Sequence, residues 1–424
     1  MTVLLLLVAI LLLLALRVPV AFAFLGPGLA YLLIEGQSLG LPMRLVANAT
    51  GNFVLLAVPL FVLLGVVANH AGIADRLFDF ALALLGKVRG GLGYVSVGVS
   101  LGFSWMSGSA VADAAALSKV EVPPMLRRGY SHRFAIGVVG AAALIAPVMP
   151  PSIPAVIFAG QAQVSTGALF AASVVPALLM AIGLCVVVFV LVRRARGIEH
   201  VGFSRARLAQ AGKRVVLPIL APVIILGGIL GGFFTPTEAA AVGAAYMLLL
   251  GFGYGTLKVR DLPRILVETA LTTAAIMLIV ASASLLGYVL ARERVPQALA
   301  ELVLGLTQDG TVFLLLVMLL MLLLGTVVDA TATLVLVVPI LLPIAVQVGV
   351  DPIVLGVVMI LALMIGLLTP PVGTVLYVLS STQKVPVSEV FRGALPFTVP
   401  LVLCCLAVIL VPGIATWLPA QLGL

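Results

Sequence analysis

Charged residues are scarce in this sequence. Only 9% of its 424 residues are Asp, Glu, Lys or Arg, whereas 63% are hydrophobic and the mean hydropathy is +1.33. Soluble domains contain about 25% charged residues, so this composition excludes a water-soluble globule. A membrane-spanning helix needs about 20 apolar residues, and the chain has room for about ten such helices. The composition therefore predicts an all-α polytopic membrane protein.

Motifs for metal binding and nucleotide hydrolysis are also missing. The only cysteines, Cys185, Cys404 and Cys405, lie in apolar stretches without CxxC spacing, which argues against disulfides and against a metal cluster. The sequence has no HExxH motif and no GxxxxGK[ST] phosphate loop, so we expect neither a metalloenzyme nor an ATPase. The net charge of +8 comes from short basic clusters between apolar runs, which predict membrane topology and no nucleic-acid partner.

These basic clusters predict which loops face the cytoplasm. The clearest is residues 193–214, where seven basic residues accompany Glu199, and we expect a cytoplasmic linker there. The N-terminal run, residues 1–23, has Arg17 after its apolar part and no basic residue before it. We therefore expect a retained first helix with its N-terminus outside, rather than a cleaved signal peptide.

One segment is flanked by basic residues on both sides. Lys87 and Arg89 precede residues 90–118, and Lys119 and Arg127 follow them, so both ends should lie inside. The segment is too long for one comfortable span and too short for two. We predict a re-entrant hairpin with its tip in the stretch "SGS" near the middle of the membrane. Irregular backbone is tolerated at that depth only where it lines a buried or wet cavity.

A second segment, residues 311–350, is bracketed by Asp309 and Asp351 without basic flanks, so its ends should lie outside. It predicts either a second hairpin or two ordinary spanning helices with Asp329 at their turn. We favour the hairpin, because each segment is followed by an apolar helix interrupted by a proline pair. Pro150-Pro151 and Pro370-Pro371 are 220 residues apart, and with the same offset Ser109 aligns with Asp329.

The matching segments predict two halves of opposite orientation, 1–192 and 215–424, joined by the linker 193–214. An inverted repeat with interrupted segments at matching positions is typical of secondary transporters with a site at the midplane. Since proline breaks a helix, the regions around residues 150 and 370 should unwind and expose carbonyl oxygens. Carbonyl and hydroxyl oxygens suit a sodium ion, and the N-termini of half-helices suit an anionic group.

From this pattern we expect at least two sodium sites and one anion site, and no catalysis. The residues predicted to bind sodium are Ser107, Gly108, Ser109, Asp113, Pro150, Ser152, Asp329, Thr331, Thr333, Thr369 and Pro370. The residues predicted to bind the substrate are Ser109, Pro151, Ser152, Thr331, Pro371 and Thr374. The alternative for Asp113 and Asp329 is that each carboxylate caps the backbone of its own hairpin.

Several stretches, taken together, resemble one known family. They are "AVPLFVLLGVVANHAGIADRL" (57–77), "SGSAVADAAALS" (107–118), "MPPSIPAVIFAG" (149–160), "GFFTPTEAAAVGAAY" (232–246), "DATATLVLVVPILLPIA" (329–345) and "GLLTPPVG" (366–373). In this order they resemble the large membrane subunit of tripartite ATP-independent periplasmic (TRAP) transporters. The resemblance covers almost the whole chain.

The resemblance implies an elevator-type fold and sodium-driven uptake of an organic acid, such as a dicarboxylate, a sialic acid or a keto acid, across the bacterial inner membrane. It implies two partners, a periplasmic substrate-binding protein and a small four-helix membrane subunit. We expect the small subunit to be a separate chain, because this chain begins at the large subunit's own first helix. The family's sodium-site regions also include the end of the second break, which adds Gly373 to the predicted ligands.

Two other functions stay open at this point. A self-sufficient sodium-coupled dicarboxylate or gluconate carrier would have the same breaks without needing a binding protein. An intramembrane enzyme could use Asp113 and Asp329 as a carboxylate pair, although the GxGD motif of intramembrane aspartyl proteases is absent.

Overall fold

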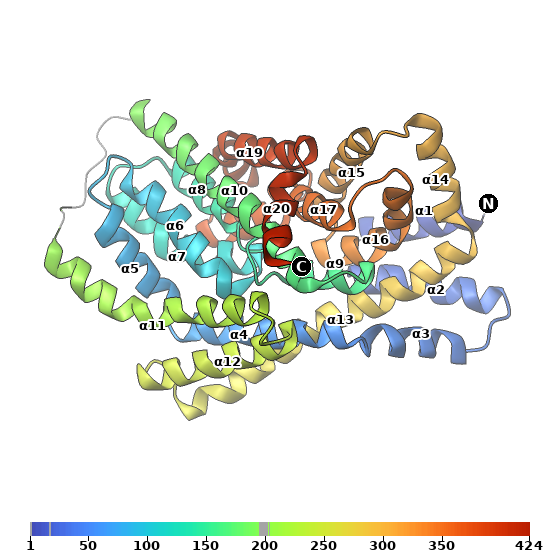
Figure 1. The fold of residues 1–424 in the computed structure, drawn as a ribbon, viewed down its shortest axis with the longest axis horizontal. Coiled ribbons are helices and arrows are strands. Elements are labelled where there is room, and N and C mark those ends of the chain that lie inside the picture. Colours follow the sequence, from blue (N-terminus) through green and yellow to red (C-terminus); the bar gives the residue numbers. More distant parts are fainter. Residues whose placement is uncertain (1, 17, 195–201, 203) are drawn as a thin grey trace.

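The computed structural model describes residues 2–16, 18–194, 202 and 204–424 (Figure 1). Within these residues the regular structure is helical throughout, without strands. Six helical segments are long and apolar enough to cross a membrane. The structure therefore confirms the predicted all-α polytopic fold.

The first half runs from α1 to α10. Its elements are α1 (Thr2–Ala15), α2 (Val20–Ile34), α3 (Gly40–Thr50), η1 (Phe53–Leu56), α4 (Ala57–His70), α5 (Ile73–Leu85), α6 (Gly91–Ser107), α7 (Ala110–Arg127), α8 (His132–Ala143), α9 (Ile153–Ala162) and α10 (Thr166–Arg194). Helices α6 and α7 form the first predicted hairpin, and α7 continues past residue 118 to Arg127.

The second half runs from α11 to α20. Its elements are α11 (Arg205–Leu230), α12 (Pro236–Gly253), η2 (Val259–Asp261), α13 (Leu262–Arg292), α14 (Val295–Leu306), α15 (Gly310–Gly325), α16 (Ala330–Gln347), α17 (Pro352–Leu367), α18 (Thr374–Gln383), α19 (Val387–Leu410) and α20 (Gly413–Leu422). Helices α15 and α16 form the second hairpin. Residues 195–201 and 203 of the predicted linker lie outside the described residues, and residues 205–214 of it already belong to α11.

Both proline-interrupted helices are broken as predicted. The chain is unwound from Leu144 to Ser152 between α8 and α9, and from Leu368 to Gly373 between α17 and α18. Each pair, Pro150-Pro151 and Pro370-Pro371, is joined by a cis peptide bond. Both breaks therefore lie where the sequence predicted them.

The broken helices lie in the interior. Every residue of α17 from Val354 to Leu367 is buried, as is every residue of α8 from Ala135 onward. In Figure 1, α9, α16 and α17 lie near the centre, whereas α11, α12, α4, α13 and α3 lie along one long edge of the molecule. Helices α4 and α12 pack against each other in this outer group. The arrangement buries the first break, whereas Pro370, Pro371 and Val372 of the second break are exposed.

Two amphipathic helices connect this outer group to the hairpins. Helix α5 leads from α4 into the first hairpin, and α14 leads from α13 into the second. Helix α5 buries one apolar face, which includes Leu77 and Phe78, and exposes Asp75 and Asp79 on the other. The two connecting helices occupy matching positions in the two halves.

Candidate functional site

The first hairpin turns at Ser107, Gly108 and Ser109. Gly108 has a φ of 62°, in the left-handed region that glycine adopts without the usual steric cost. Ser109 caps α7, because its hydroxyl accepts a hydrogen bond from the Ala112 amide at 3.4 Å. A Cβ atom on Gly108 would lie 3.3 Å from the carbonyl oxygen of Pro151. The first tip therefore packs directly against the first break.

Ser152 fixes the end of the first break. Its side chain is fully buried, and its hydroxyl donates a hydrogen bond to the Pro147 carbonyl and accepts one from the Ala155 amide at 3.2 Å. This cap starts α9 next to the tip of the first hairpin. Every residue of the first break, from Leu144 to Ser152, is buried.

Asp113 lies one turn into α7 and is fully buried. Neither of its carboxylate oxygens has a hydrogen-bond partner among the described residues. The hydroxyl of Ser107 is a polar neighbour of this carboxyl, but the pair does not reach hydrogen-bond geometry. Asp113 does not cap the hairpin, since Ser109 does. Its two oxygens are thus free for a ligand, as ionisable groups inside membrane segments generally serve function.

The second tip and the second break are joined through the backbone. The amides of Val372 and Gly373 donate hydrogen bonds to the Thr326 carbonyl at 3.1 and 2.8 Å. Asp329 caps α16 by accepting a hydrogen bond from the Thr331 amide at 2.8 Å, so the capping alternative describes its geometry. The Thr333 hydroxyl donates to the Asp329 carbonyl at 3.0 Å.

The second break is more open than the first. Pro370, Pro371 and Val372 are exposed, whereas Gly373 is buried and has a φ of 58°. Thr369 is half-buried, with its hydroxyl donating to the Ile365 carbonyl at 2.8 Å.

Helices from the two halves of the chain pack against each other. Helix α7, which follows the first tip, packs against α18, which follows the second break. Helix α16, which follows the second tip, packs against α9, which follows the first break. The side-chain amide of Gln383 on α18 donates to the Ser118 carbonyl on α7 at 3.1 Å. The helices that follow the four predicted interruptions therefore pack in pairs across the two halves.

Four helices begin at these interruptions. Helices α7, α9, α16 and α18 start directly after Ser109, Ser152, Asp329 and Gly373. The N-terminus of a helix has a partial positive charge and free amides, which attract an anionic group. The hydroxyl of Thr374, the first residue of α18, is buried without a partner among the described residues. The region thus combines positive helix ends with carboxylate, hydroxyl and carbonyl oxygens.

The predicted residues fall into two groups. At the first tip and break lie Ser107, Gly108, Ser109, Asp113, Pro150, Pro151 and Ser152. At the second tip and break lie Asp329, Thr331, Thr333, Thr369, Pro370, Pro371, Gly373 and Thr374. Each group is one tip with the break of its own half, and the helices that start there connect the groups.

Sequence reasoning missed Glu121. Its side chain is fully buried on α7, where one carboxylate oxygen accepts a hydrogen bond from the Ser96 hydroxyl of α6 and the other has no partner among the described residues. Ser100, one turn from Ser96, is also buried with an unpartnered hydroxyl. The signal was present, because Glu121 is two helical turns from Asp113 and therefore on the same face. It was obscured by Lys119 and Arg127, which suggested that the hairpin had already left the membrane.

Comparison with known proteins agrees with this architecture. The family model described as "Tripartite ATP-independent periplasmic transporter, DctM component" matches residues 7–414. The sialic acid TRAP transporter large permease protein SiaM of Vibrio cholerae is 42% identical over 95% of this chain and 94% of its own. The C4-dicarboxylate TRAP transporter large permease protein DctM of Pseudomonas aeruginosa is 36% identical over 88% of each chain.

A third relative and one solved structure extend the comparison. The 2,3-diketo-L-gulonate TRAP transporter large permease protein YiaN of Escherichia coli is 32% identical over 98% of each chain. The crystal structure of the Alcanivorax borkumensis YdaH transporter has a TM-score of 0.56, at 18% identity, over 90% of this chain and 88% of its own. This structural likeness concerns the fold alone.

The apolar helices and the names of these relatives define a multi-pass membrane transport protein. The chain belongs to the DctM family, the large permease component of the TRAP transporters.

Proposed function

We propose that this chain imports an organic acid by coupling its uptake to the inward movement of sodium ions. The observation that supports the proposal is the packing of each hairpin tip on the break of its own half, with the buried carboxylate of Asp113, unpartnered among the described residues, at the first tip. Interrupted helices at the midplane of a repeat are where secondary transporters bind substrate and coupling ions.

The oxygen atoms of the two groups suit sodium. At the first tip, Asp113 offers two free carboxylate oxygens beside the hydroxyl of Ser107. At the second tip, Asp329 uses one carboxylate oxygen for the Thr331 amide and keeps the other. We assign one sodium ion to each tip and its break. Two ions moving down a potential of about 100 mV would supply about 4.6 kcal/mol, without ATP.

The helix N-termini suit a carboxylate substrate. Sialic acid, C4-dicarboxylates and 2,3-diketo-L-gulonate, the compounds in the names of the relatives, are all carboxylates. A carboxylate between the N-termini of α7, α9, α16 and α18 would accept their free amides. Since the sialic acid permease shares 42% identity with this chain, sialic acid is the first substrate to test and a C4-dicarboxylate the second.

Membership of this family also suggests which partners the chain has and in which membrane it lies. We infer a periplasmic binding protein that delivers the acid, a small membrane subunit of four helices, and a place in the bacterial inner membrane. In an elevator mechanism the hairpins and broken helices would slide as one body against the outer helices, and the amphipathic α5 and α14 would connect the two bodies.

Transport by reconstituted vesicles tests the proposal. The chain, its membrane partner and the binding protein are placed in proteoliposomes, and uptake of labelled sialic acid or succinate is measured with and without an inward sodium gradient. We expect accumulation only with sodium and the binding protein. Replacing Ser109 or Asp329 by alanine should raise the half-saturating sodium concentration about tenfold, equivalent to about 1.4 kcal/mol of lost ion binding.

Two other caps provide matched controls. Ser131→Ala removes the cap of α8, and Asp351→Ala removes the cap of α17, so each loses the same kind of hydrogen bond away from the tips. Equal shifts in the site variants and these controls would contradict the sodium sites. Uptake by this chain alone, without a binding protein, would instead favour a self-sufficient carrier.

A further inference from the structure

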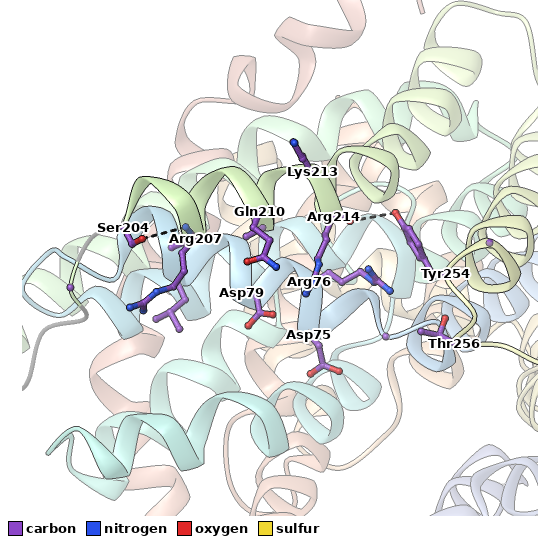
Figure 2. Close-up of a pocket in the computed structure, with 16 residues that line it drawn as sticks. Asp75, Arg76, Asp79, Ser204, Arg207, Gln210, Lys213, Arg214, Tyr254 and Thr256 are labelled. Carbon is purple, nitrogen blue, oxygen red and sulfur yellow. Dashed lines mark hydrogen bonds between the residues drawn. The ribbon is translucent and has the colours of Figure 1, made fainter.

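A polar cavity lies away from the breaks, where the connecting helix α5 meets α11 and the end of α12 (Figure 2). It has a volume of about 910 Å³, which is within the range of pockets that hold small molecules. Its polar lining includes Asp75, Arg76 and Asp79 from α5 and Arg207, Lys213 and Arg214 from α11. Four basic side chains thus face two acidic ones, which gives the cavity a net positive charge.

The charge of Arg214 acts on Asp79, but the basic groups of the cavity outnumber the acidic ones. None of the four forms a salt bridge within the described part of the chain. Arg207, Lys213 and Arg214 are exposed to the cavity and its opening, whereas Arg76 is half-buried. The guanidinium groups therefore keep donors free for a ligand with several acceptor oxygens, such as a phosphate.

The cavity is held in place from three helices. The guanidinium of Arg76 lies 3.8 Å above the centre of the Tyr254 ring, and the Tyr254 hydroxyl donates to the Arg214 carbonyl at 3.4 Å. Figure 2 shows these three residues next to one another. Helix α11 also begins here, capped by Ser204 through the Arg207 amide, and its N-terminus adds partial positive charge.

The surface beside the cavity suits acyl chains. Starting two residues beyond Arg214, the last basic residue of the cavity, α11 exposes a series of apolar side chains. They are Val216, Leu217, Ile219, Leu220 and Val223, each at least 40% exposed. Because basic clusters mark the cytoplasmic side, the cavity lies where this apolar surface meets the headgroups of the inner leaflet. Basic pockets at such positions recognise anionic headgroups.

We propose that this cavity binds the phosphate-bearing headgroup of an anionic phospholipid, whose acyl chains lie along the apolar surface of α11. The headgroup would connect α5, which leads into the first hairpin, to α11 and α12. The lipid would therefore bind where the helix that leads into the first hairpin meets the outer helices. The proposal is independent of the transported substrate.

Ligand titration of the purified full chain in detergent tests this site. The probes are soluble short-chain phosphatidylglycerol, short-chain phosphatidylcholine and inorganic phosphate, and binding is followed by native mass spectrometry and by the thermal unfolding midpoint. We expect phosphatidylglycerol to bind and to raise the midpoint, with phosphatidylcholine and phosphate at least tenfold weaker. Since each basic group near a headgroup contributes about 1 kcal/mol, Arg207→Gln with Arg214→Gln should weaken binding roughly thirtyfold.

Two further variants separate lost binding from poor folding. Arg260→Gln with Arg264→Gln removes the same charge from exposed residues outside the cavity and should leave binding unchanged. Asp79→Asn removes a negative charge from the lining and should tighten binding about fivefold. Equal binding of inorganic phosphate would overturn the lipid as ligand. Equal losses in both double variants, or no effect of Asp79→Asn, would overturn the site.

Discussion

The two hairpins have helices of similar length but different interiors. Helices α7 and α16 are both 18 residues long and begin 220 residues apart. The first hairpin buries Ser96, Ser100, Asp113 and Glu121, whereas α15 has no polar residue between Val312 and Leu324. Residue 341, the equivalent of Glu121, is a buried leucine. The first hairpin therefore buries carboxylates along its length, whereas the buried polar residues of the second, Thr326, Thr331 and Thr333, lie at its tip.

The two tips also differ in where their carboxylate and hydroxyl side chains lie. At equivalent positions the first half has Ser109 and Asp113, and the second has Asp329 and Thr333, so hydroxyl and carboxylate are interchanged. As a result the second carboxylate caps its helix, while the first lies one turn inside α7 without a partner. An unpaired buried carboxylate costs stability, so Asp113 is the residue whose position is best explained by ligand binding.

The largest expected effect comes from Asp113→Asn. Loss of the charged ligand should raise the half-saturating sodium concentration roughly 30- to 100-fold, equivalent to about 2 to 3 kcal/mol. The thermal unfolding midpoint should stay the same or rise, because no hydrogen bond is lost. Sodium-dependent uptake and thermal unfolding of the same preparation check both parts. A lower midpoint with normal sodium dependence would make Asp113 a structural residue.

The polar interior of the first hairpin is tested by Glu121. Glu121→Ala leaves the Ser96 hydroxyl buried without its partner and should cost about 2 kcal/mol of unfolding free energy. Glu121→Gln can still accept that hydrogen bond and should cost less than half as much. Leu341→Ala in the second hairpin is the apolar counterpart, with a cost of about 2 to 3 kcal/mol from lost packing alone. Equal losses in the Gln and Ala variants would show that the hydrogen bond contributes nothing.

The glycines at the interruptions should differ in tolerance. Both Gly108 and Gly373 have positive φ, so alanine costs about 1 kcal/mol at either position. A Cβ on Gly373 would also lie 2.8 Å from the Thr369 carbonyl, closer than the 3.3 Å between Gly108 and Pro151. Gly373→Ala should therefore lower the thermal unfolding midpoint more than Gly108→Ala. The reverse order would mean that the second break relaxes more easily than the first.

The smallest effect concerns the outer ends of the hairpins. Helix α6 follows Gly90, which provides no side-chain cap, whereas α15 is capped by Asp309. Hydrogen bonds from the amides of Val312 and Thr311 lower the pKa of Asp309 below its ordinary value of 3.8. This cap is complete above about pH 3.8 and is lost as the pH falls through the lowered pKa.

From pH 6 to pH 3, the thermal unfolding midpoint should therefore fall less in Asp309→Ala than in the unchanged protein. Gly90→Ala provides a comparison in the first half that removes no titrating group. An identical pH dependence in the unchanged protein and in Asp309→Ala would rule out the cap as its source.

Much of this fold could be predicted from local patterns. The proline pairs unwind their helices because proline lacks a backbone donor, whatever packs around them. The glycine and serines at residues 107–109 turn the first hairpin for an equally local reason. The basic flanks located the hairpin, although they suggested an end at residue 118 where α7 continues to Arg127. The composition of a segment does not predict the residue at which a helix ends when its surroundings are partly polar and partly apolar.

The sequence by itself determined that the chain is a helical membrane protein with two hairpins and two broken helices, since hydrophobicity and proline act within a few residues. Only the tertiary structure decided that α7 packs on α18 and α9 on α16, which brings together the helices that follow the interruptions. It also decided that Asp113 is buried without a partner while Asp329 caps a helix. Those outcomes depend on which side chains meet between elements far apart in the chain, as Gln383 and Ser118 do, and a local pattern does not specify such contacts.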